Sequence, residues 1–307
     1  MKVNICMITY NQEKFIAQAI ESVMMQETGF ACELVVGEDC STDRTREICI
    51  AYQQRYPDRI RLLLRETNLG MLRNFVQTLE ACTGEYVAIL EGDDYWTSPH
   101  KLQKQVDFLD THHDYAVCFT RTMCFVEDGS RKPHYIPPDE YEKHTLTIED
   151  LLRDESICTC STMFRNGLLD AFPDWYFSLG IGDWPLHIMN ARHGKVGYIP
   201  ETMAAYRIHS KSYYSSRTAV DRLLGNVQFL HAINGYLNFE YDPVVREMLA
   251  QTYQALSILY FCRMDVVKGA RFTLESIRSL PTKQYLTSVS RRNMTKAMRE
   301  LQRRRRR

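Results

Sequence analysis

The sequence predicts an α/β protein in which a mostly parallel sheet is flanked by helices and followed by a helical carboxyl-terminal extension. Two observations predict this class. From residue 3 to residue 94, short apolar runs alternate with segments whose apolar residues recur at helical spacing. Each of these runs also ends in a cluster of polar residues, and in parallel sheets ligands bind beyond the carboxyl ends of the strands.

Three strand–helix repeats and a fourth strand make up the amino-terminal part. The apolar runs expected to form strands are residues 3–9, 33–37, 60–64 and 86–90. Between them, apolar residues spaced for one buried face predict helices at about residues 15–23, 43–52 and 69–82. Asp43 is expected to cap the second of these helices. This alternation predicts a parallel sheet that helices cover on both faces.

The pattern is less regular after residue 100. Strands are expected at residues 116–126, 161–164, 196–199 and 203–208, and short helices at 147–154 and 183–192. A polar, proline-rich stretch at 131–143 is expected to form a loop. After residue 216 the pattern is helical, with helices beginning near residues 221, 243, 265 and 282. We therefore expect one domain over residues 1–215 and a helical region with a basic tail over 216–307.

Charge is unevenly spread along the chain. Basic and acidic residues each number 38, but ten basic residues and one acid, Glu300, fall within residues 283–307. The rest of the chain has a net charge of −9, which argues against a general nucleic-acid binder with a positive folded surface. Three interpretations of the tail stay open: a solubilising end, a docking helix for an acidic partner, and a contact with anionic lipid at the inner face of the plasma membrane.

The ten cysteines are expected to be buried, reduced thiols. Several, such as Cys6 and Cys118, lie in apolar stretches, where a free thiol behaves as a small hydrophobic side chain. Cys158 and Cys160 are too close together for a zinc knuckle and lack a second pair of ligands. The sequence shows no signal peptide and no apolar run of about twenty residues. We therefore expect a cytoplasmic protein.

Polar side chains follow each of the first four expected strands, in residues 9–13, 38–43, 68–74 and 91–94. Any one of these clusters can be explained by turns and helix caps. Because the carboxyl ends of parallel strands meet at one edge of a sheet, four such clusters with several carboxylates predict a ligand site at that edge.

Six segments together resemble the inverting glycosyltransferase family 2, whose catalytic domain has the GT-A fold, a Rossmann-like α/β fold. The resemblance covers about residues 3–212. Its segments are ICMITYNQEKFIAQAIESVMMQ (5–26), ELVVGEDCSTDRT (33–45), NLGMLRNF (68–75), EYVAILEGDDYWTSPHKLQKQ (85–105), GDWPLHI (182–188) and YRIHSKS (206–212). Each segment is moderately specific, and their order along the chain makes the set strong.

The resemblance implies a site for a nucleotide sugar, commonly a UDP-sugar. Asp39 matches the family's acid that accepts a hydrogen bond from the base, and Glu91 matches a residue that contacts the ribose. Glu13 can equally favour the first helical turn, and Arg73 can equally be a surface residue. The residues expected to line this site are Thr9, Tyr10, Asn11, Glu13, Asp39, Asn68, Arg73, Glu91 and Asp93.

A divalent cation, Mn²⁺ or Mg²⁺, is also implied, because the charge of the leaving diphosphate must be neutralised. The segment Glu91-Gly92-Asp93-Asp94 resembles the family's DxD element and makes Asp93 the metal ligand. Asp94 is either part of the site or a cap of the next turn. His209 is a second candidate ligand for the metal or the diphosphate, although a lone histidine is often structural. Arg207 and Lys211 are further candidates for phosphate contacts.

Asp183 resembles the family's catalytic base, which takes the proton of the acceptor hydroxyl. The family often shows Glu-Asp at this point, whereas this sequence has Gly182-Asp183, so one substrate contact of the family is missing. A helix begins near Asp183, and the residue can instead cap that helix.

These observations favour a metal-dependent glycosyltransferase, moving a hexosyl or N-acetylhexosaminyl group to a glycan, lipid-linked or cell-surface polysaccharide acceptor. A nucleotidyltransferase-like enzyme is one alternative, but its glycine-rich phosphate loop is missing from ITYNQEKF (residues 8–15). A non-catalytic sugar-nucleotide-binding or scaffold protein is the other, but it predicts the loss of Asp39, Asp93 or Asp183, and all three are present.

Overall fold

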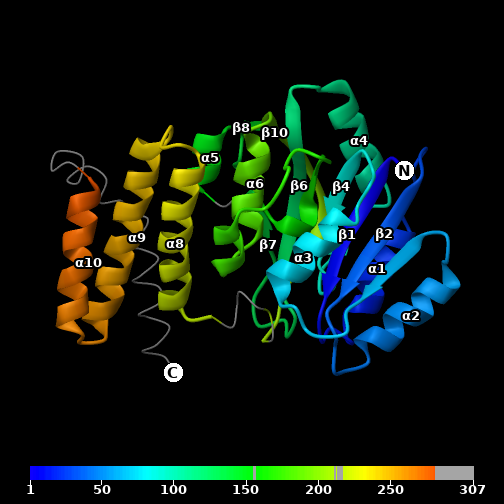
Figure 1. The fold of residues 1–307 in the computed structure, drawn as a ribbon, viewed down its shortest axis with the longest axis horizontal. Coiled ribbons are helices and arrows are strands. Elements are labelled where there is room, and N and C mark those ends of the chain that lie inside the picture. Colours follow the sequence, from blue (N-terminus) through cyan, green and yellow to red (C-terminus); the bar gives the residue numbers. More distant parts are fainter. Residues whose placement is uncertain (155–156, 211, 213–216, 281–307) are drawn as a thin grey trace. The chain divides into compact units, whose positions relative to one another are not determined.

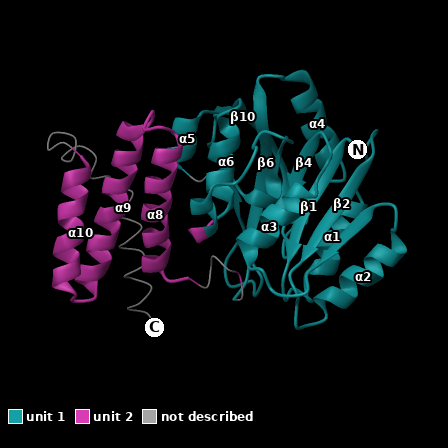
Figure 2. Ribbon diagram, viewed as in Figure 1, with its two compact units in different colours: residues 1–177, 182–210 teal, residues 178–181, 211–307 magenta. Residues whose placement is uncertain are grey.

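The computed structural model describes residues 1–154, 157–210, 212 and 217–280, which form two compact units (Figure 2). The first unit contains residues 1–177 and 182–210, and the second contains residues 178–181 and the described residues after 210. Lys211, the helix expected from about residue 282 and the basic tail lie outside the described residues. The assignment of separate roles to residues 1–215 and 216–307 stays a proposal.

A ten-stranded sheet forms the centre of the first unit (Figure 1). Its main path runs in the order β3-β2-β1-β4-β9-β6-β10-β5, while β7 pairs with β6 and β8 with β10. β1 to β4 pair in parallel, as do β6 and β10, and β9 is antiparallel to both β4 and β6. The strands are β1 (Val3–Thr9), β2 (Cys32–Glu38), β3 (Ile60–Leu64), β4 (Tyr86–Ile89), β5 (Tyr95–Trp96), β6 (Tyr115–Val126), β7 (His134–Ile136), β8 (Thr145–Leu146), β9 (Thr162–Arg165) and β10 (Lys195–Ile208).

Helices cover both faces of this sheet, as its apolar strands require. Alternate residues of β1, such as Ile5 and Met7, pack into a core with α1, α2 and α4, and α3 and α6 lie on the opposite face (Figure 1). The mostly parallel α/β fold is therefore confirmed. The helices of this unit are α1 (Ile16–Met24), α2 (Thr45–Arg55), α3 (Met71–Glu80), α4 (Lys101–Thr111), α5 (Ile148–Arg153) and α6 (Asp183–Ala191), with 3₁₀ turns η1 (Thr159–Ser161) and η2 (Asp174–Ser178).

Two expectations about local structure were wrong. The strands expected at 196–199 and 203–208 are one strand, β10. The register of β10 against β6 shifts between Ile199 and Ala204. Pro200 lies within this irregular part of the strand, so it does not end the strand. The stretch 131–143, expected to be only a loop, contains the short strand β7, which pairs with β6 through residues 122–124. Pairing to a neighbouring strand decides the structure in both places.

Helix α4 was not expected, although Leu102, Val106 and Leu109 recur at helical spacing and are buried. Its first residue, Lys101, is also fully buried. The Lys101 ammonium donates to Gln105 Oε1 at 2.6 Å and lies 4.3 Å from the centre of the Trp96 ring. Burial lowers the pKa of Lys101 to about 7, because a charge is costly in an apolar core.

The second unit is helical. Its helices are α8 (Ala219–Tyr236), α9 (Asp242–Cys262) and α10 (Val266–Ser279), and α9 packs against both α8 and α10. The hydroxyl of Thr218 caps α8, and the carboxylate of Asp265 caps α10. Among the described residues, no helix has both the length and the apolar character that crossing a bilayer requires.

Candidate active site

The carboxyl end of β1 lies between the ends of β2 and β4, and backbone hydrogen bonds continue past all three strands. The amide of Asp39, after β2, donates to the carbonyl oxygen of Thr9 at 3.1 Å, and the amide of Gly92, after β4, donates to that of Ile8 at 3.1 Å. The polar residues that follow these strands are therefore held at one edge of the sheet.

Asp39 is almost fully buried, and both oxygens of its carboxylate are used. They accept the backbone N–H groups of Leu69 at 2.7 Å and Gly70 at 3.0 Å, while Asn68 donates its amide to the Asp39 carbonyl at 3.0 Å. Gly70 has a φ of 81°, a conformation that favours glycine. Asp39 thus holds the loop before α3, and each oxygen keeps a lone pair with which to accept a base N–H.

The four expected residues at the end of β1 and in the turn that follows it have different environments. Thr9 is buried and its hydroxyl donates to Gln12 Oε1 at 2.7 Å, whereas Tyr10 is exposed at the end of the strand. Asn11 has a φ of 52° and accepts the Thr42 N–H at 2.8 Å, which joins this turn to the loop after β2. The exposed carboxylate of Glu13 accepts the N–H of Arg44 at 3.1 Å. Glu13 therefore links the turn before α1 to the start of α2, and it does not lie in the first turn of α1, which contains no acid. Its contact with the donor stays a prediction.

Asn68 and Arg73 lie before and on α3. Asn68 is exposed and lies beside Asp39, to whose backbone carbonyl its side chain donates, and its contact with the donor stays a prediction. Arg73 is exposed, and its guanidinium lies 5.2 Å from the centre of the Phe177 ring. This stacking is a surface contact between α3 and η2, and a contact of Arg73 with phosphate stays a prediction.

The turn after β4 concentrates three carboxyl groups in partly apolar surroundings. The pKa of Glu91 is raised to about 8, mainly by burial and to a smaller extent by repulsion from Asp93 and Asp183. The Oε2 atom of Glu91 is buried and has no hydrogen-bond partner in the protein. Burial and repulsion from Asp93 also raise the pKa of Asp94 well above its ordinary value. The Asp94 carboxylate accepts the N–H of Arg207 at 2.8 Å. Asp94 therefore joins this turn to β10 and does not cap the turn that follows.

Asp93 faces His209, which directly follows β10. The Asp93 Oδ2 and His209 Nε2 atoms are 3.0 Å apart, and their side chains are 18% and 10% exposed. The carboxylate oxygen of Asp93 is a ligand that both Mn²⁺ and Mg²⁺ take, and the imidazole nitrogen of His209 suits the transition metal Mn²⁺ better than the harder Mg²⁺. Among the described residues, no three His, Cys, Asp or Glu side chains are grouped to hold a metal ion. The pair therefore fits a cation that takes its other ligands from the diphosphate and from water.

Arg207 does not have the phosphate-contacting role suggested for it. Its side chain is 6% exposed and lies between the rings of Phe15, Tyr95 and Phe125, at 4.6, 5.5 and 5.1 Å. Its Nε donates to the carbonyl oxygen of Asp93 at 2.9 Å, and its Nη1 pairs with the carboxylate of Glu127. The guanidinium therefore uses its donors within the protein, where it holds the turn that contains Asp93 in place.

Asp183 is the first residue of α6, and Gly182 occupies the capping position. The Asp183 Oδ1 atom accepts the N–H of Trp184 at 2.9 Å, and Oδ2 accepts the hydroxyl of Thr159 at 2.7 Å. Asp183 is close enough to Glu91 for its charge to contribute to the raised pKa of Glu91. Thr159 was not expected in the site, and no pattern in the sequence singles it out, because its contact with Asp183 depends on how η1 meets α6.

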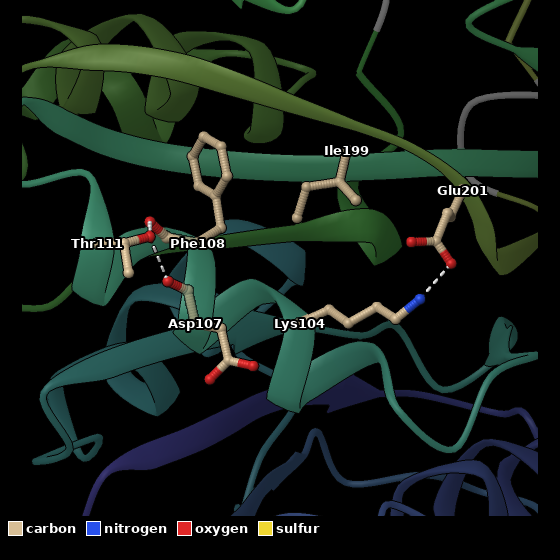
Figure 3. A pocket seen from close by; sticks show the side chains of 6 residues that line it. All are labelled: Lys104, Asp107, Phe108, Thr111, Ile199 and Glu201. Atoms are coloured by element: carbon tan, nitrogen blue, oxygen red, sulfur yellow. Dashed lines mark hydrogen bonds and ion pairs between the residues drawn. The ribbon is translucent and has the colours of Figure 1, made fainter.

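An open surface depression lies elsewhere on the first unit, between α4 and β10 (Figure 3). Lys104 and Glu201, on opposite sides of it, form an ion pair with each other. The depression contains none of the expected site residues, and it is not a candidate for the donor site. Its lining residues are Lys104, Asp107, Phe108, Thr111, Ile199 and Glu201.

Comparison with known sequences gives consistent matches. The family model described as glycosyl transferase family 2 matches residues 4–172. An uncharacterized protein of Mycobacterium tuberculosis is 39% identical over 213 residues, which cover 69% of this chain and 60% of that protein, so the chain spans less than two thirds of its length. An uncharacterized glycosyltransferase of Nostoc sp. is 37% identical over 223 residues, 70% of this chain and 67% of the relative. The minor teichoic acid biosynthesis protein GgaB of Bacillus subtilis is 24% identical over 218 residues, 70% of this chain and 24% of GgaB.

Two solved structures share the fold. TarS of S. aureus, in complex with UDP-GlcNAc, superposes with a TM-score of 0.59 at 19% identity and covers 89% of this chain and 91% of its own. The mannosyltransferase PcManGT of Pyrobaculum calidifontis, in complex with GDP-Man and Mn²⁺, superposes with a TM-score of 0.60 at 18% identity and covers 97% of this chain and 83% of its own. At these identities the likeness concerns the arrangement of strands and helices.

Proposed function

This chain belongs to glycosyl transferase family 2 and has the GT-A fold of that family, and on that premise we propose that it is an inverting glycosyltransferase. It moves a sugar from a nucleotide sugar, most simply a UDP-sugar, to a hydroxyl group of an acceptor. The observation that carries the proposal is that Asp93, on the same turn as Glu91, and Asp183, at the start of α6, both lie close enough to Glu91 to raise its pKa, with His209 3.0 Å from Asp93.

The donor is held from its base to its diphosphate along the end of the sheet. Asp39 accepts the base N–H, residues 9–11 line the nucleoside, Asn68 and Arg73 approach it from α3, and Glu91 contacts the ribose. The unpartnered Glu91 Oε2 supports this role, because a buried carboxyl oxygen without a partner is costly unless a ligand supplies one.

Asp93 and His209 are the residues that would hold Mn²⁺ or Mg²⁺. When bound, the cation supplies a Lewis acid that neutralises the diphosphate leaving group. Arg207 keeps the Asp93 backbone in place through a hydrogen bond of 2.9 Å, so the ligand is fixed before the donor arrives.

Asp183 is the general base. It accepts the proton of the acceptor hydroxyl while the hydroxyl oxygen attacks the anomeric carbon, and the bond from that carbon to the diphosphate oxygen breaks with its electron pair on the leaving group. Attack from the side opposite the leaving group inverts the anomeric configuration. Thr159 and the Trp184 N–H fix the two oxygens of Asp183.

The acceptor is proposed to be a glycan, a lipid-linked sugar or a cell-surface polysaccharide, receiving a hexosyl or N-acetylhexosaminyl group. The name of the relative GgaB, a teichoic acid biosynthesis protein, supports a cell-surface acceptor. A cytoplasmic location, with a peripheral contact at the inner face of the plasma membrane through the basic tail, is also a proposal, and that tail lies outside the described residues.

A screen of UDP-, GDP- and dTDP-sugars with Mn²⁺ tests the proposal by measuring the nucleoside diphosphate released. The expected result is release from one donor class by the native protein and none by Asp183→Asn. Pyrophosphate released from nucleoside triphosphates, without hydrolysis of any nucleotide sugar, would identify a nucleotidyltransferase instead. Binding of a nucleotide sugar with no turnover under any condition would favour a scaffold protein.

A further inference from the structure

Large apolar side chains are exposed along one part of the second unit, the outer face of α10 and the turn that joins α9 to α10. Met264 is 83% exposed, Val267 81%, Val266 59% and Leu274 53%. Ile277 adds to the same region at 40%. We call these five residues the α10 apolar surface. Isolated exposed apolar residues are normal, but a contiguous group usually marks an interaction site.

α10 packs on α9 through small and polar buried residues and through one aromatic side chain, that of Phe272, which stacks on Tyr253 and Tyr260. The carbonyl of the buried Gly269 accepts the Ser257 hydroxyl at 2.9 Å, and the buried Ser276 donates to the Ala250 carbonyl at 2.7 Å. Val267, Leu274 and Ile277 recur at helical spacing on the exposed side. An apolar stripe normally faces the core, so this stripe is not explained by folding.

Met264 gives independent support. It occupies the turn between the helices with a φ of 61°, a conformation that costs a non-glycine residue free energy and that asparagine or glycine adopts more readily. Among the large apolar residues that the structure describes, Met264 is nevertheless the most exposed. A large apolar side chain in a strained, exposed turn does not stabilise the fold, which points to a role in binding.

The charges around this surface indicate the partner. From residue 263 to residue 278 the chain has four basic residues, Arg263, Lys268, Arg271 and Arg278, and two acids. The acids, Asp265 and Glu275, pair with Lys268 and Arg278. A second copy of this chain would bring like charges together across a symmetric contact, which is unfavourable. An anionic lipid surface complements both the net positive charge and the apolar side chains.

We propose that the α10 apolar surface docks on a membrane that contains anionic lipid. Met264, Val267 and Leu274 enter the boundary between head groups and acyl chains, and Arg263 and Arg271, which are not used by the two acids, lie at the lipid phosphates. The contact is peripheral and reversible, because it consists of a few apolar side chains and a modest charge. It involves described residues of the second unit and does not depend on the proposed transfer reaction.

Sedimentation of the full-length protein with vesicles tests the proposal. The vesicles are phosphatidylcholine alone, or phosphatidylcholine with three parts in ten phosphatidylglycerol. The native protein is expected to bind the anionic vesicles at least about tenfold more strongly than the neutral ones. The double variant Val267→Ser and Leu274→Ser keeps every charge and is expected to lose about tenfold or more of this binding. Met25→Ser, at a residue that is 39% exposed on the first unit, serves as the matched control and is expected to change nothing.

Met264→Asn separates binding from folding. It is expected to weaken vesicle binding while leaving the melting temperature unchanged or raising it, because asparagine tolerates the positive φ. Native-like vesicle binding by the double variant would overturn the proposal, and so would equal binding of the native protein to neutral and anionic vesicles. If light scattering shows a dimer that only the double variant loses, the surface binds a second copy and the lipid proposal fails.

Discussion

The Oδ2 atom of Asp93 lies 3.0 Å from the Nε2 atom of His209, although the two residues are 116 positions apart in the sequence. The short strand β5 explains this proximity. β5 follows Asp93 almost immediately and pairs with β10 through Trp96 and Ala204, so the turn after β4 is carried to the end of β10. Two elements that are not neighbours along the main path of the sheet thereby contribute to one candidate metal site.

Replacing either member of this pair is expected to weaken the binding of Mn²⁺. Asp93→Ala should abolish transfer and metal-dependent donor binding, and His209→Ala should raise the Mn²⁺ concentration for half-maximal donor binding by roughly tenfold or more. Titration of Mn²⁺ into the protein with a bound donor measures both effects. His100→Ala, at an exposed histidine outside the site, is the control. An unchanged titration for His209→Ala would remove this residue from the metal site.

Asp183→Asn is expected to lower turnover by about a thousandfold while donor binding persists, because the amide cannot accept the acceptor's proton. The measurement is turnover and donor affinity side by side. Thr159 tests how the base is positioned. Thr159→Val removes the hydroxyl that bonds to Asp183 and should lower the turnover number without raising KM for the donor, whereas Thr159→Ser should restore activity. Near-normal turnover by Asp183→Asn would show that another group is the base.

Gly92→Ala is expected to disturb the turn that carries Asp93. A Cβ at residue 92 would lie 2.4 Å from Gln12 Oε1 and 2.8 Å from Thr9 Oγ1, so the end of β1 or the turn must shift. Donor binding should weaken about tenfold or more, since a small displacement of metal and ribose contacts is costly. Gly235→Ala has no atom within 4 Å of the new Cβ and is the matched control. Equal donor affinity in the two variants would contradict the expected crowding.

Arg207→Met is expected to reduce both stability and metal binding. The substitution leaves the carbonyl oxygen of Asp93 without the donor that now lies 2.9 Å away, and it unpairs the Glu127 carboxylate. A loss of roughly 2 kcal/mol in the free energy of unfolding is expected. Chemical denaturation measures the stability, and the Mn²⁺ titration measures the effect on the site. A variant that loses stability but keeps native Mn²⁺ affinity would show that Arg207 does not position Asp93.

Lys101 is expected to make stability depend on pH. Its pKa is about 7 in the folded protein against 10.5 for a lysine side chain in water, so above pH 7 the unfolded chain binds more protons than the folded chain. The contribution of Lys101 to the free energy of unfolding should therefore rise with pH, by roughly 2 kcal/mol between pH 7 and pH 9. Glu91, whose pKa is raised to about 8, acts in the opposite sense over this range but is present in both proteins, so the quantity to measure is the difference in free energy of unfolding between the native protein and Lys101→Met at the two pH values. This difference should change by roughly 2 kcal/mol in favour of the native protein, and a difference that does not depend on pH would refute a buried lysine with a lowered pKa.

Local pattern was enough to predict the elements of the amino-terminal half. β1 and β3 occupy the expected residues. A short, uninterrupted apolar run bounded by polar turns is stable in an α/β fold as a strand buried within the sheet. α4 was missed because two residues of its buried face, Lys101 and Gln105, are polar, and β5 because two residues carry no periodicity. Where a short strand begins and ends depends on the neighbouring strand with which it pairs. The sequence pattern of the short segment alone carries no information about that neighbour.

The candidate site was predicted only as a set of residue types. The sequence pointed to Asp39, Asp93, Asp183 and His209, whose chemical roles stay predictions, and the structure adds the partners that hold them. Thr159 and Gly70 are ordinary residues in the sequence, and their contacts with Asp183 and Asp39 arise from tertiary packing. Arg207 had the right chemistry for phosphate, but three aromatic rings and Glu127 enclose it.

β10 has a consequence for how the protein is made. The strand is the last of the sheet to be synthesised, and His209 follows its final residue, Ile208. A ribosome adds about 5–20 residues per second, so the carboxylate of Asp93 waits on the order of ten seconds for the imidazole that it faces. A nascent chain that stops within β10 has neither a finished sheet nor the second candidate ligand. The candidate metal site therefore becomes complete only after translation has passed this strand.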